Sequence, residues 1–140
     1  MIETLKIKLL GGLHAHDDWE CALEIPLDYS LDELHQAILW AVGFDDDHLY
    51  EFCIASSYYS ISAQRIYCDD DKVIQETIET IFPKAKGKKL FYMFDYGDSW
   101  LFQINKSRKK CFTEKPDTFY PRVVLESGIK PEQYPEWDEY

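Results

Sequence analysis

One segment of this 140-residue chain restricts the fold more than any other: Phe91 to Ile104, which reads FYMFDYGDSWLFQI. An apolar run meets Asp95-Tyr96-Gly97-Asp98, and a second apolar run follows directly. Two strand-like runs joined by a short turn rich in Gly and Asp are typical of a β-hairpin. The sequence therefore predicts an aromatic-rich hairpin with two carboxylates at its tip. This spacing of residues matches no catalytic motif.

Alternation of apolar and polar residues predicts the other strands. The clearest case is Leu5, Ile7 and Leu9, which alternate with Lys6 and Lys8. The connections between the runs are short, which favours mostly antiparallel pairing. The further strands are expected at residues 5–9, 19–25, 49–54, 58–67 and 122–126.

Two segments have helical signals. Ser30 and Glu33 form a capping box before apolar residues at helical spacing, and Gly43 suits the position just after the helix. Asp69–Asp71 is expected to begin a second helix, which Pro83 ends. Its apolar face would consist of Val73, Ile74, Ile78, Ile81 and Phe82. Strands and helices in this order predict one α+β domain over residues 1–140, with an irregular, proline-rich tail at 129–140.

The charge is strongly acidic and unevenly distributed. The net charge is −11, and residues 14–51 contain eleven Asp and Glu and no Lys or Arg. Residues 84–115 are the exception, with nine Lys and Arg against three Asp and Glu. The overall field disfavours duplex DNA and anionic membranes as partners.

The location expected from the sequence is the cytoplasm. The chain contains no apolar run long enough to span a membrane, and its first residues lack the pattern of a secretory signal. The four cysteines form no C-x-x-C pair, so we expect reduced thiols rather than a disulfide framework.

Three motifs resemble those of the plasmid pRiA4b ORF-3-like family, and the resemblance covers nearly the whole chain. They are Leu34-His35-x-x-Ile38, His48-Leu49-x-x-Phe52 and the segment Tyr92–Trp100. The resemblance implies a compact α+β domain with a curved antiparallel sheet packed with two main helices, and a family without an established activity. The chain departs from the family where Glu20-Cys21-Ala22 follows Trp19, because many relatives have Arg there. It also lacks the acidic-Cys-Gly-Gly ending of many relatives.

The family motifs single out four residues that could lie together, His35, His48, Asp95 and Asp98. A histidine with carboxylates could serve as a hydrolytic acid/base pair or hold a divalent metal ion. The alternative is structural. A helix histidine would hydrogen-bond a buried carboxylate, and the two aspartates would accept turn N–H groups. Together with Tyr96, Gly97 and Trp100, these residues form the candidate functional surface.

Other clusters have weaker chemical meaning. His14, His16, Asp17 and Asp18 could bind a metal ion or simply form a polar turn between two strands. The triplets 45–47 and 69–71 lack the ligand spacing of a calcium loop and are expected to be turns and caps. A nucleic-acid surface would require exposed aromatic residues, Tyr92, Tyr96 or Phe102, beside a basic cluster. That cluster consists of Lys106, Arg108, Lys109 and Lys110.

These observations predict a small, non-catalytic binding or adaptor domain without a cofactor, whose partner is expected to be a protein. Its recognition surface would lie near the hairpin tip, Asp95–Trp100, and the first helix. One alternative is a metal-dependent hydrolase or metal-binding protein that uses His35, His48, Asp95 and Asp98. A second is single-stranded nucleic-acid binding through residues 84–115. The acidic and basic segments could also pair between subunits and form an oligomer.

Overall fold

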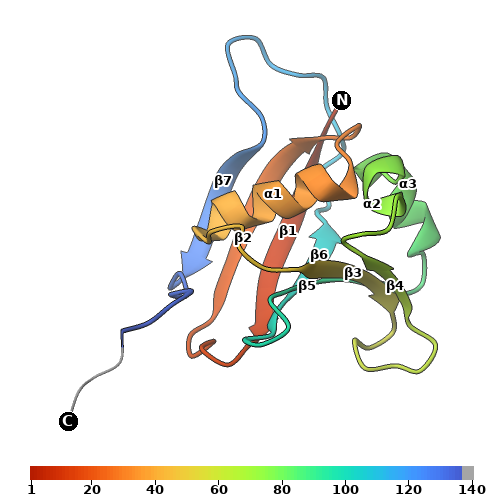
Figure 1. The fold of residues 1–140 in the computed structure, drawn as a ribbon. Coiled ribbons are helices and arrows are strands. Elements are labelled where there is room, and N and C mark those ends of the chain that lie inside the picture. Colours follow the sequence, from red (N-terminus) through yellow and green to blue (C-terminus); the bar gives the residue numbers. More distant parts are fainter. Residues whose placement is uncertain (137–140) are drawn as a thin grey trace.

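The structure, a computed structural model, describes residues 1–136 as one seven-stranded antiparallel sheet with three helices (Figure 1). The strand order is β4-β3-β5-β6-β1-β2-β7. The expected α+β class and antiparallel pairing are therefore confirmed. The strands are β1 (Ile2–Gly11), β2 (Trp19–Pro26), β3 (Tyr50–Ala55), β4 (Gln64–Tyr67), β5 (Lys89–Phe94), β6 (Trp100–Lys106) and β7 (Arg122–Gly128); the helices are α1 (Leu31–Val42), α2 (Lys72–Gln75) and α3 (Ile78–Lys84).

The main core lies between α1 and one face of the sheet, which α1 crosses (Figure 1). Side chains alternate between the two faces of a strand, so Leu5, Ile7 and Leu9 of β1 point into this core, whereas Lys6 and Lys8 are exposed on the other face. Neighbouring strands supply the large aromatic residues of the same core. These include Trp19, Phe52, Tyr92, Phe94, Trp100 and Phe102, all of them buried.

Helix α1 begins and ends where the sequence predicts. The Ser30 hydroxyl accepts a hydrogen bond from the Glu33 backbone N–H, and the Glu33 carboxylate accepts one from the Ser30 N–H, each at 3.1 Å. At the other end, Gly43 has φ of +83°, a left-handed conformation that costs glycine little. Both signals are local in sequence, which is why they identify this helix without help from the rest of the fold.

The predicted hairpin is also confirmed, as β5 and β6. The last pair across the hairpin joins Phe94 to Trp100, which leaves residues 95–99 as the connecting turn. We call these five residues the hairpin tip. Two of them, Asp95 and Ser99, have positive φ values of 64° and 55°. The tip is therefore a tight turn, in which the chain reverses within five residues.

The strand predicted over 58–67 is wrong for its first half. Only Gln64–Tyr67 forms a strand, β4. The residues before it form turns, in which Ser57 and Ser60 carbonyls accept hydrogen bonds from Ser60 and Ala63 N–H groups. Serine competes with strand pairing by favouring such turns, and this run is rich in serine.

The second predicted helix begins after Asp69–Asp71 as expected, with the Asp70 carboxylate accepting a hydrogen bond from the Lys72 N–H, but it is divided into two. Glu76 is extended, with φ of −76° and ψ of 139°, and Asp71 makes no capping bond with its side chain. Thr77 provides a separate cap for α3, and Pro83 lies inside α3 rather than ending it. The break is tertiary in origin, because the backbone on either side of Thr77 bonds to Tyr29 and Leu31.

The rest of the chain adds three findings. No helix among residues 1–136 is long and apolar enough to cross a membrane. The four cysteines are free, and Cys21 and Cys53 are buried. Residues 129–136 contain no helix or strand, and the end of the predicted tail, 137–140, lies outside the described residues.

Candidate functional site

The loop between α1 and β3 lies directly against the hairpin tip. We call its residues 45–48, Asp-Asp-Asp-His, the acidic turn. The backbone N–H of Asp95 donates to the carbonyl of Leu49 at 2.9 Å, and His48 Nε2 lies 3.4 Å from Asp95 Oδ2. Residues from the first and second halves of the sequence therefore meet here, as the family motifs suggested.

His35 is a buried part of this site. It lies on the inner face of α1, is 2% exposed, and stacks on the ring of Tyr50 with centroids 3.8 Å apart. Its Nε2 lies 3.1 Å from Asp46 Oδ1, and its Nδ1 lies 2.5 Å from the Tyr92 hydroxyl. A carboxylate only accepts hydrogen bonds, so Nε2 carries the proton of the neutral ring and the Tyr92 hydroxyl donates to Nδ1.

Burial keeps this pair in its neutral form. Desolvation lowers the pKa of His35, although Asp46 and Asp32 oppose the shift, and desolvation raises the pKa of the Tyr92 phenol. A neutral imidazole that accepts from a neutral phenol satisfies both groups inside the core. Neither group is exposed at the surface.

The lowered pKa of His35 gives a testable pH dependence. The unfolded chain takes up a proton at His35 as the pH falls through its ordinary pKa of 6.5, whereas the folded protein does so only at lower pH. The unfolded state then binds more protons, so the stability contributed by the neutral His35 is complete above that pH and is lost below it. We expect the difference in unfolding free energy between the natural protein and His35→Gln to shrink on acidification.

Urea unfolding between about pH 5 and pH 8 measures this difference. Subtracting the curve of the variant removes the contribution of other carboxyl groups that both proteins share. A constant difference for His35→Gln across the whole range would contradict the assignment.

Asp95 organises the hairpin tip. Its side chain is buried, and Oδ1 accepts hydrogen bonds from the N–H groups of Gly97 at 3.0 Å and Asp98 at 3.3 Å. The backbone at Asp95 has φ of +64°, a conformation in which Asp and Asn are enriched among residues other than glycine. These are the turn-capping bonds that the structural alternative predicts for this carboxylate.

His48 lies on the surface beside the C-terminal segment. It is 40% exposed, and its Nε2 lies 2.8 Å from the Tyr134 hydroxyl and 3.7 Å from Asp47 Oδ1. The buried Gln133 amide accepts from the Asp45 N–H and donates to the Asp45 carbonyl and to Asp47 Oδ1. Sequence reasoning missed both tail residues, because no charge or periodicity distinguishes them.

Three of the four residues singled out from the motifs meet at Asp95, which contacts both His48 and Asp98, whereas His35 bonds elsewhere. His48 meets Asp95, whereas both ring nitrogens of His35 are bonded to Tyr92 and Asp46. Asp98 is tied through its carbonyl, which accepts from the Leu13 N–H at 2.8 Å. Among residues 1–136, no group of three or more His, Cys, Asp or Glu side chains is arranged to hold a metal ion. These contacts favour the structural alternative, although the Asp46 carboxylate is 55% exposed rather than buried, and only Asp95 accepts turn N–H groups with its side chain. The metal site stays a prediction.

The other candidate site residues from the sequence differ in their burial and in their contacts. Trp100 is fully buried against Phe44, with ring centroids 4.8 Å apart, whereas Tyr96 is half exposed and its hydroxyl donates to the Tyr50 carbonyl. His14, His16 and Asp17 line a hollow of about 170 Å³ beside the C-terminal segment. Among the acidic triplets, Asp70 accepts a hydrogen bond from the Lys72 N–H, which is a capping role.

The predicted basic cluster does not form one stacking surface. Tyr92 and Phe102 are fully buried, so neither ring is available to a base. Lys109 is engaged with Glu24 at 3.5 Å, while Lys106 lies beside Phe82 at the edge of a hollow described below. Single-stranded nucleic-acid binding across the whole of residues 84–115 stays a prediction.

Comparisons with known proteins place this fold among uncharacterised ones. A family model described as plasmid pRiA4b ORF-3-like protein matches residues 4–134. The crystal structure of MM3350, a protein of unknown function from Methanosarcina mazei Go1, superposes with a TM-score of 0.70 at 21% identity, covering 89% of this chain and 68% of that one. At that identity the likeness shows the fold alone. No curated protein matches the chain, and none of these comparisons indicates a catalytic activity.

Proposed function

This chain belongs to the plasmid pRiA4b ORF-3-like family, and we propose that it is a non-catalytic binding domain that recognises a protein partner at the hairpin tip and the acidic turn. The observation that carries the proposal is that the polar groups of this site bond within the protein, while apolar surface is exposed beside them. The histidines and carboxylates hydrogen-bond to one another, to Tyr92 and to the backbone, and exposed side chains with apolar surface lie beside them.

Three exposed side chains form what we call the tip surface. They belong to Leu49, Tyr96 and Tyr134, residues that are 63%, 45% and 53% exposed. Both tyrosines bond to residues that flank Leu49 in the sequence. Tyr134 bonds to His48, and the Tyr96 hydroxyl donates to the carbonyl of Tyr50. Exposed tyrosines on a rigid frame are typical of protein interfaces, because they bury much area at little cost in conformational entropy.

The charge around the tip surface favours a basic partner. Asp45, Asp46 and Asp47 lie beside it, within a segment that contains no Lys or Arg. Complementary charge speeds association and selects among partners more than it adds affinity. The partner is therefore a protein segment that combines Lys or Arg with an apolar side chain. We place this interaction in the cytoplasm, in keeping with four free cysteines.

Selection of random peptides displayed on phage tests the proposal. We expect enrichment of peptides that contain Lys or Arg next to apolar residues. The double variant Leu49→Ala/Tyr96→Ala should bind the enriched peptides at least about tenfold more weakly, because truncating a central interface residue costs more than 1 kcal/mol.

The matched control removes comparable exposed side chains elsewhere. Tyr59 and Ile61 are exposed on the loop between β3 and β4, so Tyr59→Ala/Ile61→Ala should leave peptide binding unchanged. The proposal is contradicted if no peptide is enriched, or if the two double variants lose binding equally.

A further inference from the structure

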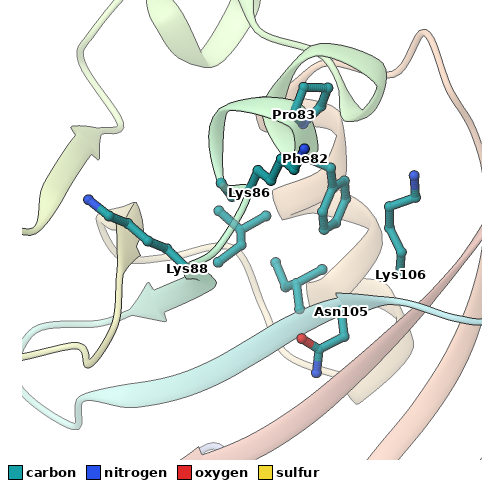
Figure 2. A pocket seen from close by; sticks show the side chains of 9 residues that line it. Phe82, Pro83, Lys86, Lys88, Asn105 and Lys106 are labelled. Atoms are coloured by element: carbon teal, nitrogen blue, oxygen red, sulfur yellow. The ribbon is translucent and has the colours of Figure 1, made fainter.

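A hollow with an apolar floor lies between the end of α3 and strands β5 and β6 (Figure 2). Its volume is about 320 Å³, at the lower end of the range for small-molecule sites. Leu90 and Ile104, both buried, contribute side chains from the two strands, and the half-buried ring of Phe82 comes from α3. It shares no residue with the tip surface.

The rim of this hollow is basic, although the chain as a whole is acidic. Lys86, Lys88 and Lys106 line it, and no carboxylate does. In Figure 2, Lys86 and Lys106 lie on either side of Phe82, whereas Lys88 extends away from it. None of the three forms an ion pair within 4.0 Å of another residue in the range 1–136, although the charge of Lys106 opposes the rise that burial causes in the pKa of Glu3. The Lys106 ammonium lies 6.0 Å from the centroid of the Phe82 ring, and this ring lies at the rim.

We propose that this hollow binds a nucleotide unit, with its phosphate between Lys86 and Lys106 and its base against Phe82 and the apolar floor. Two unpaired ammonium groups supply charge-assisted hydrogen bonds to phosphate oxygens. An aromatic ring beside them supplies a stacking face, which accepts any base because every base has a π-face. The same chemistry is present in a free mononucleotide and at the 5′-phosphorylated end of a single strand.

The smallness of the hollow restricts the ligand. A volume of about 320 Å³ accommodates one nucleotide unit rather than a length of strand. The net charge of −11 repels a long polyanion. This repulsion is weaker for a single phosphate held by two lysines. The proposal therefore differs from nucleic-acid binding along the whole basic segment, because the hollow contacts only one nucleotide unit.

Calorimetric titration at low salt with adenosine 5′-monophosphate tests the proposal. We expect saturable binding that the double variant Lys86→Gln/Lys106→Gln weakens by at least about tenfold, because each lysine contributes a charge-assisted hydrogen bond. Phe82→Leu keeps an apolar side chain and removes the stacking face. It should weaken binding of the nucleotide and leave that of inorganic phosphate unchanged.

A second double variant separates a site from general attraction. Lys6→Gln/Lys8→Gln removes the same charge at exposed positions of β1 outside the hollow, and it should bind the nucleotide as the natural protein does. Equal losses in the two double variants, or no binding of the nucleotide, would overturn the proposal. So would equal affinity for inorganic phosphate and the nucleotide, because the base would then make no contact.

A 5′-phosphorylated oligothymidine distinguishes the two sources of the ligand. Tighter binding of this strand than of thymidine 5′-monophosphate assigns the strand end as the ligand, and equal binding assigns the free nucleotide. Either result supports the shared chemistry. Circular dichroism of every variant confirms that the losses do not come from unfolding.

Discussion

Replacing His35 with alanine is expected to lower the free energy of unfolding by about 3 to 4 kcal/mol. The imidazole is 2% exposed and packs against Tyr50 at 3.8 Å between ring centroids, so its removal leaves a cavity. It also leaves the Tyr92 hydroxyl without its hydrogen-bond acceptor inside the core. An orphaned buried hydroxyl carries the full penalty of its lost hydration, which adds to the cost of the cavity.

His48→Ala is the matched control for this prediction. His48 is 40% exposed and bonds to groups at the surface, so its removal should cost less than about 1 kcal/mol. Urea unfolding followed by tryptophan fluorescence measures both variants, and an unchanged m value shows that the unfolding transition remains comparable. Equal losses for the two histidines, or a larger loss for His48, would contradict the structural role of His35.

The second large effect is expected at Asp95. Asp95→Ala should lower the free energy of unfolding by about 2 to 3 kcal/mol, because alanine at φ of +64° is strained and the Gly97 and Asp98 N–H groups lose their acceptor. Asp95→Asn should cost less than about 1 kcal/mol, since asparagine keeps the Oδ1 acceptor and tolerates the left-handed conformation.

The comparison of these two variants separates the effect of the turn hydrogen bonds that Asp95 accepts from the effect of its negative charge. Both remove the negative charge that lies 3.4 Å from His48 Nε2, and only alanine removes the acceptor. Thermal and urea unfolding of both proteins measure the difference. If asparagine destabilised the protein as much as alanine does, the contact with His48 would matter more than the turn bonds, and the role given to Asp95 would be wrong.

The elements that could be predicted are those whose signals lie within a few residues. The capping box at Ser30 and Glu33, the left-handed Gly43 and the turn at 95–99 each identify an element without its neighbours. The division of the second helix could not be foreseen, because its cause is the pairing of Thr77 with Ser30, nearly fifty residues earlier in the chain. The strand order likewise depends on contacts that local pattern does not encode.

The residue types of the site could be predicted from the sequence, but most of their hydrogen-bond partners could not. The motifs drew attention to His35 and Asp95, and the capping bonds of Asp95 were among the alternatives. The carboxylate that pairs with His35 is Asp46, which the sequence marks only as part of an acidic turn. Gln133, which ties the tail to that turn, carries no signal at all, because a lone glutamine is equally common on any surface.

The central claim is that the hairpin tip and the acidic turn form a binding surface rather than a catalytic centre. Nuclear magnetic resonance of the ¹⁵N-labelled protein, titrated with the peptide most enriched by selection, tests it most directly. The account predicts that the shifted amide signals cluster at residues 45–50, 95–99 and 133–134. Shifts that cluster elsewhere, or no shifts at saturating peptide, would contradict it.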